Sequence, residues 1–396
     1  MKKTVAIIGS GPAALMLGAT LNEKHFDATI YEKNFAPARK FLVAGDGGFN
    51  LTHSEDIEQF ITRYTPQSFL EKSIRSFTNT DLCNWLKQIG IETFVGSSKR
   101  IFPEKGVKPI DVLKAILNEL KNKNVQIKTK HEWKGWNDKN ELIINHNNEN
   151  TFVKADLVVF ALGGASWAKT GSDGSWTNLF AKKGIEIIPF EASNCAYQIK
   201  WDDKFLKQAE GKSIKNISIT CHEGERKGEV VITKFGMEGG AVYGLSPQIR
   251  KELKENNKAT IFIDLKPTFS IEAIKSKFNT KENKTLTTIL KEDLNLSAVQ
   301  TALLKSNLSK EEFLNVNILA EKMKKLPLLI IGIAPIDEAI STVGGISLLE
   351  VDESFQLKKL PNHYTIGEML DWDAPTGGYL LQACFSMGFF LGKEIR

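Results

Sequence analysis

Glycines at fixed spacing near the start of the chain could bind a phosphate group. Gly9, Gly11 and Ala14 follow the pattern G-x-G-x-x-A, and Glu32 lies 23 residues after Gly9. Gly9 would allow a tight turn after a strand, Gly11 would leave room for a diphosphate, and alanine is an accepted third residue. The N–H groups that open the following helix would bind the diphosphate. Glu32 would accept hydrogen bonds from ribose hydroxyls, so the pattern favours FAD or NAD over a dinucleotide with a 2′-phosphate.

A second glycine-rich segment could contact a planar ligand. Three of the four residues from Gly45 to Gly48 are glycine, which lets a backbone approach a ring closely. Arg39 and Lys40 precede them and could neutralise a diphosphate or polarise a flavin. Side chains that could hydrogen-bond the flavin edge or the ribityl chain follow at Asn50 and Thr52. A structural loop with exposed basic residues is the alternative interpretation.

An apolar stretch at 156–162 is typical of a buried strand, and it ends in Gly163-Gly164. This combination recurs in two-domain flavoproteins, where the backbone passes under the FAD diphosphate. No second G-x-G-x-x-G/A pattern follows a predicted strand. A resident NAD(P)H domain is therefore not expected, and NAD(P)H is expected only as a transient electron donor.

The last part of the chain supplies two further glycine segments. Gly367-Glu368 follows a predicted strand at 363–366 and could bind the ribityl chain or the diphosphate. Gly377-Gly378 opens the last predicted helix, whose N-terminus would stabilise the negative charge of a reduced flavin. These segments narrow the predicted cofactor to FAD.

The sequence thus predicts a site built from both ends of the chain. The predicted cofactor-binding residues are Gly9, Gly11, Pro12, Ala13, Ala14, Glu32, Lys33, Arg39, Lys40, Gly48, Asn50, Leu51, Thr52, Ala161, Gly163, Gly367, Glu368, Asp371, Gly377, Gly378 and Tyr379. Catalytic residues are not assigned, and the candidates for a substrate pocket are His53, Tyr243, Trp372 and Tyr379. For each candidate, packing is the alternative role.

The elements that must position these residues predict an α/β plus β fold. A strand, a helix and a strand at 3–9, 12–24 and 27–32 form a Rossmann βαβ unit with a parallel sheet. From about residue 190, short alternating segments predict an antiparallel barrel or sandwich. The pattern then becomes helical, and it returns to strands at 328–333 and 337–346.

Three domains follow from this order. We expect a discontinuous Rossmann-type FAD-binding domain at 1–190 and 345–396, a β-barrel-like middle domain at 191–266 and 326–344, and a helical cap insertion at 267–325.

Charge is unevenly distributed along the 396 residues, whose formal net charge is +5. Residues 250–325 hold 15 lysines and arginines against 10 aspartates and glutamates, and the rest of the chain is neutral. A solvated helical face explains this, and the alternative is a surface that attracts an anionic substrate or RNA.

Other patterns point to a cytoplasmic protein without a metal. No apolar run reaches the roughly 18 residues that suggest a membrane span. The four cysteines form no C-x-x-C pair, and the six histidines form no metal-binding pattern. A membrane partner is not expected, and the sequence does not predict the oligomeric state.

Taken together, the motifs resemble the bacterial three-domain flavoproteins that include aminoacetone oxidase and the BaiN/RdsA-like proteins. The strings that carry the resemblance are Arg39 to Leu42, Gly47 to Ser54, Gly163 to Trp167, Pro335 to Ser341, Gly367 to Trp372 and Thr376 to Tyr379. The resemblance implies a glutathione-reductase-like FAD domain, a β-barrel-like domain, a helical insertion that caps the flavin, bound FAD and oxidoreductase activity. In the BaiN/RdsA branch a cysteine stands where this chain has Phe49, and this departure argues against an RNA dihydrouridine activity.

The sequence therefore predicts an FAD-dependent oxidoreductase that acts on a small organic molecule, such as an amine or an amino ketone. One alternative is a flavin-dependent reductase that modifies RNA, with RNA as a less favoured partner. The other is a flavin redox sensor without turnover.

Overall fold

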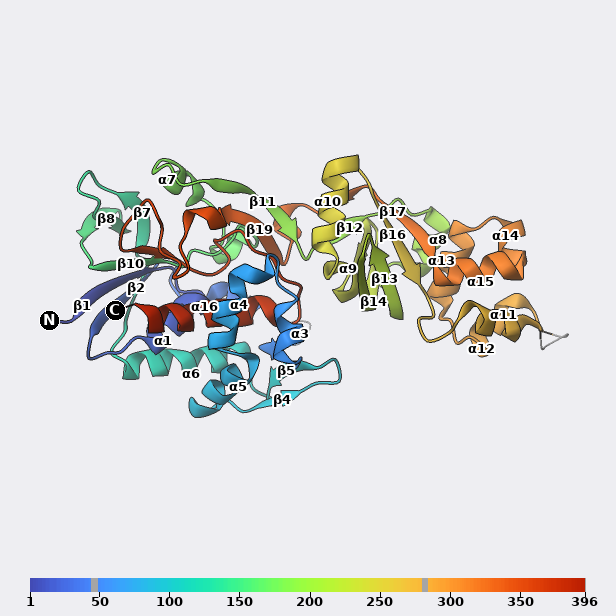
Figure 1. Ribbon diagram of the computed structural model, residues 1–396, viewed down its shortest axis with the longest axis horizontal. Coiled ribbons are helices and arrows are strands. Elements are labelled where there is room, and N and C mark those ends of the chain that lie inside the picture. The colour runs from blue at the N-terminus through green and yellow to red at the C-terminus, as the bar shows by residue number, and fades with distance from the viewer. Residues whose placement is uncertain (44–48, 280–283, 396) are drawn as a thin grey trace. The chain divides into compact units, whose positions relative to one another are not determined.

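The computed structural model describes residues 1–43, 49–279 and 284–395 (Figure 1). Contacts divide the chain into two compact units, one formed by Met1–Ala192 with Ile336–Arg396 and the other by Ser193–Pro335. The sequence placed these divisions near residues 190 and 345. In the described part of the chain, no helix combines the length and apolar content that a bilayer crossing requires.

A five-stranded parallel sheet organises the first unit. Its order is β20 (His363–Thr365), β10 (Leu157–Phe160), β1 (Lys3–Ile8), β2 (Phe26–Glu32) and β6 (Gln126–Thr129). Each neighbouring pair runs parallel. The prediction of a Rossmann-type sheet is confirmed, and β20 joins it from the far end of the chain.

Helices α1 (Pro12–Thr20), α6 (Pro109–Asn122) and α16 (Tyr379–Glu394) pack beside the sheet, and α1 contacts both others (Figure 1). Helix α1 ends at Thr20, four residues before the predicted end, because the Asn22 side chain accepts a hydrogen bond from Lys24 N and forms a turn. A Cβ built on Gly388 would lie 2.3 Å from the Ala13 carbonyl oxygen. Glycine there lets α16 approach the backbone of α1.

The remaining helices and strands of the first unit surround this sheet. They are α2 (Arg39–Val43), β3 (Thr52–His53), α3 (Ile57–Ile61), α4 (Gln67–Ser76), α5 (Asn79–Gln88), β4 (Thr93–Val95), β5 (Arg100–Pro103), β7 (Glu132–Trp136), β8 (Leu142–His146), β9 (Glu149–Val153), α7 (Thr177–Ala181), β11 (Ile187–Ser193) and β19 (Ser341–Ile346). The predicted strand at 337–346 begins only at Ser341, because Ile336–Glu338 form a 3₁₀ turn.

The second unit contains a seven-stranded antiparallel sheet. Its strands, in sheet order, are β17 (Leu326–Ile330), β16 (Ala259–Asp264), β13 (Ser213–Cys221), β14 (Gly224–Thr233), β15 (Gly236–Glu238), β12 (Tyr197–Gln198) and β18 (Gly332–Ile333). Only Ile331 separates β17 from β18 in the chain, yet β17 pairs with β16 and β18 pairs with β12. The sheet therefore closes on itself as a barrel, as the sequence predicted.

Eight helices accompany the barrel in the described residues of this unit. They are α8 (Asp203–Ala209), α9 (Gly240–Tyr243), α10 (Ser246–Asn256), α11 (Ile271–Asn279), α12 (Leu286–Glu292), α13 (Ala298–Asn307), α14 (Lys310–Leu314) and α15 (Val316–Lys324). The last five fall in the segment expected to be helical. Their buried residues, such as Leu303 and Leu319, join one core with barrel residues such as Ile261. The sequence missed α8, α9 and α10.

The close approach of α1 and α16 gives a testable consequence for stability. We expect Gly388→Ala to lower the free energy of unfolding by about 2 kcal/mol, because its methyl group would overlap the Ala13 carbonyl. Gly18→Ala is the matched control within α1, since its Cβ would make an ordinary 3.4 Å contact with Leu120. Urea denaturation of both variants checks this, and equal losses would contradict it.

Candidate functional site

A cavity of about 390 Å³ lies at the carboxyl ends of β1, β2 and β10, within the first unit. Ligands of open α/β sheets bind at this edge, and the volume is within the range of known ligand pockets. Of the predicted cofactor-binding residues, those that line the cleft are Gly9, Gly11, Pro12, Ala13, Glu32, Lys33, Arg39, Lys40, Ala161, Gly163, Gly367 and Glu368.

The two positions of the phosphate-binding pattern are occupied by glycine for different structural reasons. Gly9 has φ +98°, and a Cβ built on it would lie 2.4 Å from the Ala161 carbonyl oxygen. Gly11 has an ordinary φ of −69°, and a Cβ built on it would meet nothing within 4 Å, although Gly11 lines the cleft. The fold therefore requires glycine at position 9, whereas at position 11 the open space suits a bound ligand.

The start of α1 is ready to bind an anion. Gly11 is its N-cap and contributes no side-chain hydrogen bond, so the first N–H groups of the helix keep their capacity for a ligand. These N–H groups and the space beside Gly11 fit a diphosphate.

Glu32 lies at the floor of the cleft with its carboxylate fixed in place. Ser10 Oγ donates to one carboxylate oxygen, and Asn34 donates to the other through its backbone N and its Nδ2, both at 2.7 Å. The side chain is buried, at 8% exposure. A carboxylate offers about four lone-pair sites, so capacity remains for a ribose hydroxyl. Ser10 and Asn34 were not predicted, because only the folded structure shows which donors reach Glu32.

Lys40 links the two ends of the chain inside the cleft. Its Nζ lies 3.0 Å from Glu368 Oε2 and 3.0 Å from Ser166 Oγ. Its charge is thus already paired with a carboxylate. Arg39, by contrast, donates to the neutral Asn34 side chain at 3.2 Å and lies over the Phe35 ring. Arg39 therefore suits the predicted neutralisation of a diphosphate better than Lys40 does.

The predicted turn before α16 meets Thr52 outside the cleft lining. Gly377 and Gly378 have φ values of +117° and +100°, and a Cβ on Gly378 would lie 2.5 Å from Thr52 Cα. Thr52 Oγ1 is buried and has no hydrogen-bond partner among the described residues. The predicted role of Thr52 in binding the cofactor stays a prediction.

A polar network holds the first residue of α16. The Tyr379 hydroxyl donates to Glu55 Oε2 at 2.7 Å, and Glu55 is paired with Arg63 through Nε at 3.0 Å and also through Nη2. Burial, followed by the hydrogen bond to Glu55, raises the pKa of the Tyr379 hydroxyl well above its ordinary value, so it is neutral at pH 7. Tyr64 OH donates to the Tyr379 carbonyl at 2.8 Å.

The catalytic candidates have packing contacts, and the described lining of the cleft contains none of them. His53 Nδ1 accepts from Glu55 N at 3.1 Å, and its ring stacks on Tyr379 at 5.3 Å between centroids. Trp372 is 2% exposed and donates from Nε1 to the Gly367 carbonyl at 2.9 Å. Tyr243 lies in the second unit and is buried. Their roles in catalysis stay predictions.

Other predicted cofactor-binding residues lie elsewhere in the first unit. Ala14 and Leu51 are in the core, and Asp371 accepts a hydrogen bond from Gly344 N at 2.9 Å. Asn50, which precedes Leu51 in the chain, is half-buried. Gly48 is outside the described residues.

The cleft also has lining residues that sequence reasoning missed. Trp133, Asp173 and Cys384 line it, and none belongs to a recognisable motif. Trp133 Nε1 is buried and has no hydrogen-bond partner in the part of the chain that the structure describes. A ligand in the cleft could accept a hydrogen bond from Trp133 Nε1.

Comparison with known proteins places the chain among relatives of similar length. The sequence model described as HI0933-like protein Rossmann domain matches residues 3–394, which confirms the resemblance drawn from the motifs. A 3-dehydro-bile acid delta(4,6)-reductase from Clostridium scindens is 24% identical, over 98% of this chain and 98% of the relative. A ribosomal RNA dihydrouridine synthase from Haemophilus influenzae is also 24% identical, over 98% and 97%.

Among solved structures, 3-ketosteroid-delta4-(5alpha)-dehydrogenase from Rhodococcus jostii RHA1 matches with a TM-score of 0.51. The match covers 99% of this chain and 96% of that protein at 12% identity. At this identity the likeness shows a shared fold.

The open space at Gly11 gives the first prediction for the site. We expect Gly11→Ala to weaken FAD binding at least about ten-fold, because its methyl group would take the space of the diphosphate. The free energy of unfolding of the apoprotein should change by no more than about 0.5 kcal/mol, since the methyl group meets no protein atom. Fluorescence titration and urea denaturation check both. Gly9→Ala should instead destabilise the fold, and unchanged FAD affinity in Gly11→Ala would contradict the site.

The Glu55 network predicts a pH dependence of stability. Burial would raise the pKa of Glu55, but hydrogen bonds from Arg63 and Tyr379 lower it below its ordinary value of 4.5. Its contribution is therefore present above that value and is lost as the pH falls through the lower folded pKa. We expect Glu55→Gln to cost about 2 kcal/mol at pH 7, and the difference from the wild type to shrink below that pH range.

Glu58→Gln is the matched control for Glu55→Gln. Glu58 also pairs with an arginine through two bonds, to Arg75 at 2.7 and 2.8 Å, but its side chain is 65% exposed. Urea denaturation from pH 7 to pH 3 should show little effect of this variant. A pH-independent loss in Glu55→Gln would contradict the role given to its charge.

Proposed function

The chain belongs to the HI0933-like family of FAD-dependent, Rossmann-domain oxidoreductases, and we propose that it reduces a carbon–carbon double bond conjugated to a carbonyl group in a small organic molecule. The observation that carries the cofactor part of this proposal is the open space at Gly11, directly before the N-terminus of α1 and beside Glu32.

The double bond is suggested by what the two relatives have in common. One is named for the reduction of 4,6 double bonds in a 3-dehydro bile acid, and the other for making dihydrouridine in ribosomal RNA. Both names describe saturation of a carbon–carbon bond that is conjugated to a carbonyl group. A substrate of this electronic type is therefore the first class to test.

The chain's own residues would bind and orient the cofactor. Glu32 would hold the ribose, and the N–H groups at the start of α1 would hold the diphosphate. The Lys40–Glu368 pair would join α2 to the C-terminal segment beside the cofactor. When bound, reduced FAD would supply the hydride chemistry for such a reduction. A nicotinamide dinucleotide is the expected donor of the electrons.

RNA is the less favoured substrate for a structural reason. The resemblance to the BaiN/RdsA branch implies a cysteine where this chain has Phe49. The Phe49 ring is 7% exposed and packs edge-on against Phe41 at 4.9 Å between centroids. A buried phenyl ring offers no thiol for addition to a uracil. Oxidation of an amine or an amino ketone is the other small-molecule class that the sequence suggested.

Anaerobic stopped-flow spectroscopy tests the proposal. The FAD-loaded protein is reduced with NADPH or NADH and then mixed with a cyclic enone, a 3-oxo-Δ4 steroid or uridine. We expect the visible absorbance of the oxidised flavin to return with at least one conjugated carbonyl compound and not with its saturated analogue.

The same instrument tests the alternative directly. Oxidised FAD-loaded protein is mixed with amines and amino ketones without oxygen. Bleaching of the flavin by these compounds, together with no reoxidation by any conjugated carbonyl compound, would overturn the reductase proposal in favour of an oxidase.

A further inference from the structure

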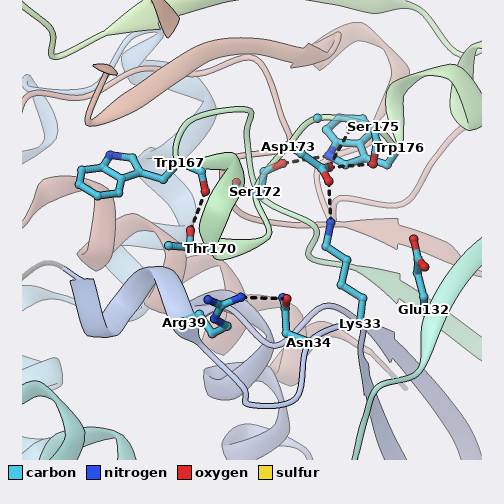
Figure 2. Close-up of polar contacts among 12 residues, drawn as sticks. Lys33, Asn34, Arg39, Glu132, Trp167, Thr170, Ser172, Asp173, Ser175 and Trp176 are labelled. Carbon is cyan, nitrogen blue, oxygen red and sulfur yellow. Dashed lines mark hydrogen bonds and ion pairs between the residues drawn. The ribbon is translucent and has the colours of Figure 1, made fainter. Parts of the chain in front are cut away.

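An ion pair joins two segments that line the cofactor cleft from different sides. Lys33 follows β2, and Asp173 lies in the segment after β10, 140 residues away in the chain. Lys33 Nζ and Asp173 Oδ2 are 2.8 Å apart, and both residues line the cleft. Figure 2 shows the Lys33 side chain extending to Asp173 on the opposite segment.

The same two segments also approach each other closely at Gly171. A Cβ built on Gly171 would lie 2.5 Å from Asn34 Nδ2, and Gly171 has φ +108°. The segment from Trp167 to Ser175 therefore packs directly on the residue next to Lys33. Asn34 is also the residue that fixes the Glu32 carboxylate, so this contact lies beside the predicted ribose site.

Asp173 is held ready to receive the lysine. Its Oδ1 accepts from Ser175 N at 3.0 Å and from Ser175 Oγ at 2.7 Å, which leaves Oδ2 directed to Lys33. Burial would raise the pKa of Asp173, but the hydrogen bonds from Lys33 and Ser175 lower it below its ordinary value, so the carboxylate is charged at pH 7.

The base of this segment is fixed to the strand end below it. Ser172 Oγ donates to the Gly164 carbonyl at 2.8 Å, and Trp176 Nε1 donates to the Gly163 carbonyl at 3.1 Å. These bonds tie the segment to the wall of the cleft on one side. The Lys33–Asp173 pair ties it to the other wall.

We propose that Asp173, acting through Lys33, is a positioning residue that retains the cofactor, because their ion pair closes the adenosine part of the cleft. This inference rests on the proposed FAD function. A cofactor that lies on Glu32 and the start of α1 would leave only after the pair had broken. The side chains are 31% and 37% exposed, so the pair is accessible to salt and its effect is a few-fold rather than absolute.

Because Lys33 and Asp173 carry opposite charges, single variants can distinguish this proposal from a simple electrostatic attraction between the cleft and the diphosphate. If only the charge near the diphosphate mattered, Lys33→Met would speed FAD release and Asp173→Asn would slow it. If the Lys33–Asp173 ion pair instead closes the cleft, both partners are needed, so both variants should speed FAD release. The double variant should release FAD no faster than either single variant, since the same interaction is lost in each.

A second lysine of the cleft provides the matched control. Lys134 pairs with Glu132 at 2.6 Å, and both line the cleft, but both belong to β7 and their pair joins no second segment. Lys134→Met removes the same charge from the cleft without opening it.

The test measures FAD release from the loaded protein by the rise in flavin fluorescence after dilution. We expect about three-fold faster release in Lys33→Met, Asp173→Asn and the double variant, and an unchanged rate in Lys134→Met. High salt should speed release from the wild type and much less from the variants.

Three results would overturn the proposal that the Lys33–Asp173 pair retains the cofactor. They are slower release in Asp173→Asn, equal acceleration in Lys134→Met, and additive effects in the double variant. A wild-type protein that binds no FAD would instead remove the proposed function itself. The two failures are therefore distinguishable in one set of measurements.

Discussion

The close contact between Gly9 and the carbonyl of Ala161 fixes the geometry on which the site depends. Gly9 N donates to the Tyr31 carbonyl at 2.9 Å, and Ala161 N donates to the Ile8 carbonyl at 2.8 Å, so three strand ends are held together just beyond the sheet. A Cβ at position 9 would lie 2.4 Å from the Ala161 oxygen. Because this turn is fixed, α1 begins at the edge of the cleft and Gly11 faces open space.

The cleft is then completed by residues from distant parts of the chain. The Lys40–Glu368 pair spans 328 residues, and the Lys33–Asp173 pair spans 140. Glycines again allow the approach, since Gly388 lets α16 lie against α1. The parallel sheet thus positions the turn at Gly9, and the long-range polar pairs join the segments that line the cleft.

The sequence predicted the parts of the site that a local pattern encodes. The βαβ unit, Glu32 and the glycine segments could be recognised because each has its own spacing and turn requirement. The partners of Glu32, the Tyr379–Glu55 bond and Asp173 could not, since each depends on which side chains the fold brings together. Among the elements, α10 was missed because its sequence is mostly charged and polar and it buries few residues, namely Ser246, Ile249 and Arg250.

We propose that the cleft beside Gly11 and Glu32 binds the adenosine diphosphate part of FAD. Titration of the apoprotein with FAD, FMN and ADP, followed by calorimetry, tests this most directly. We expect one FAD per chain, competition by ADP at the same site, and FMN binding weaker by at least about 100-fold, because FMN lacks the adenosine and one phosphate. Equal affinity for FMN and FAD, without competition by ADP, would contradict it.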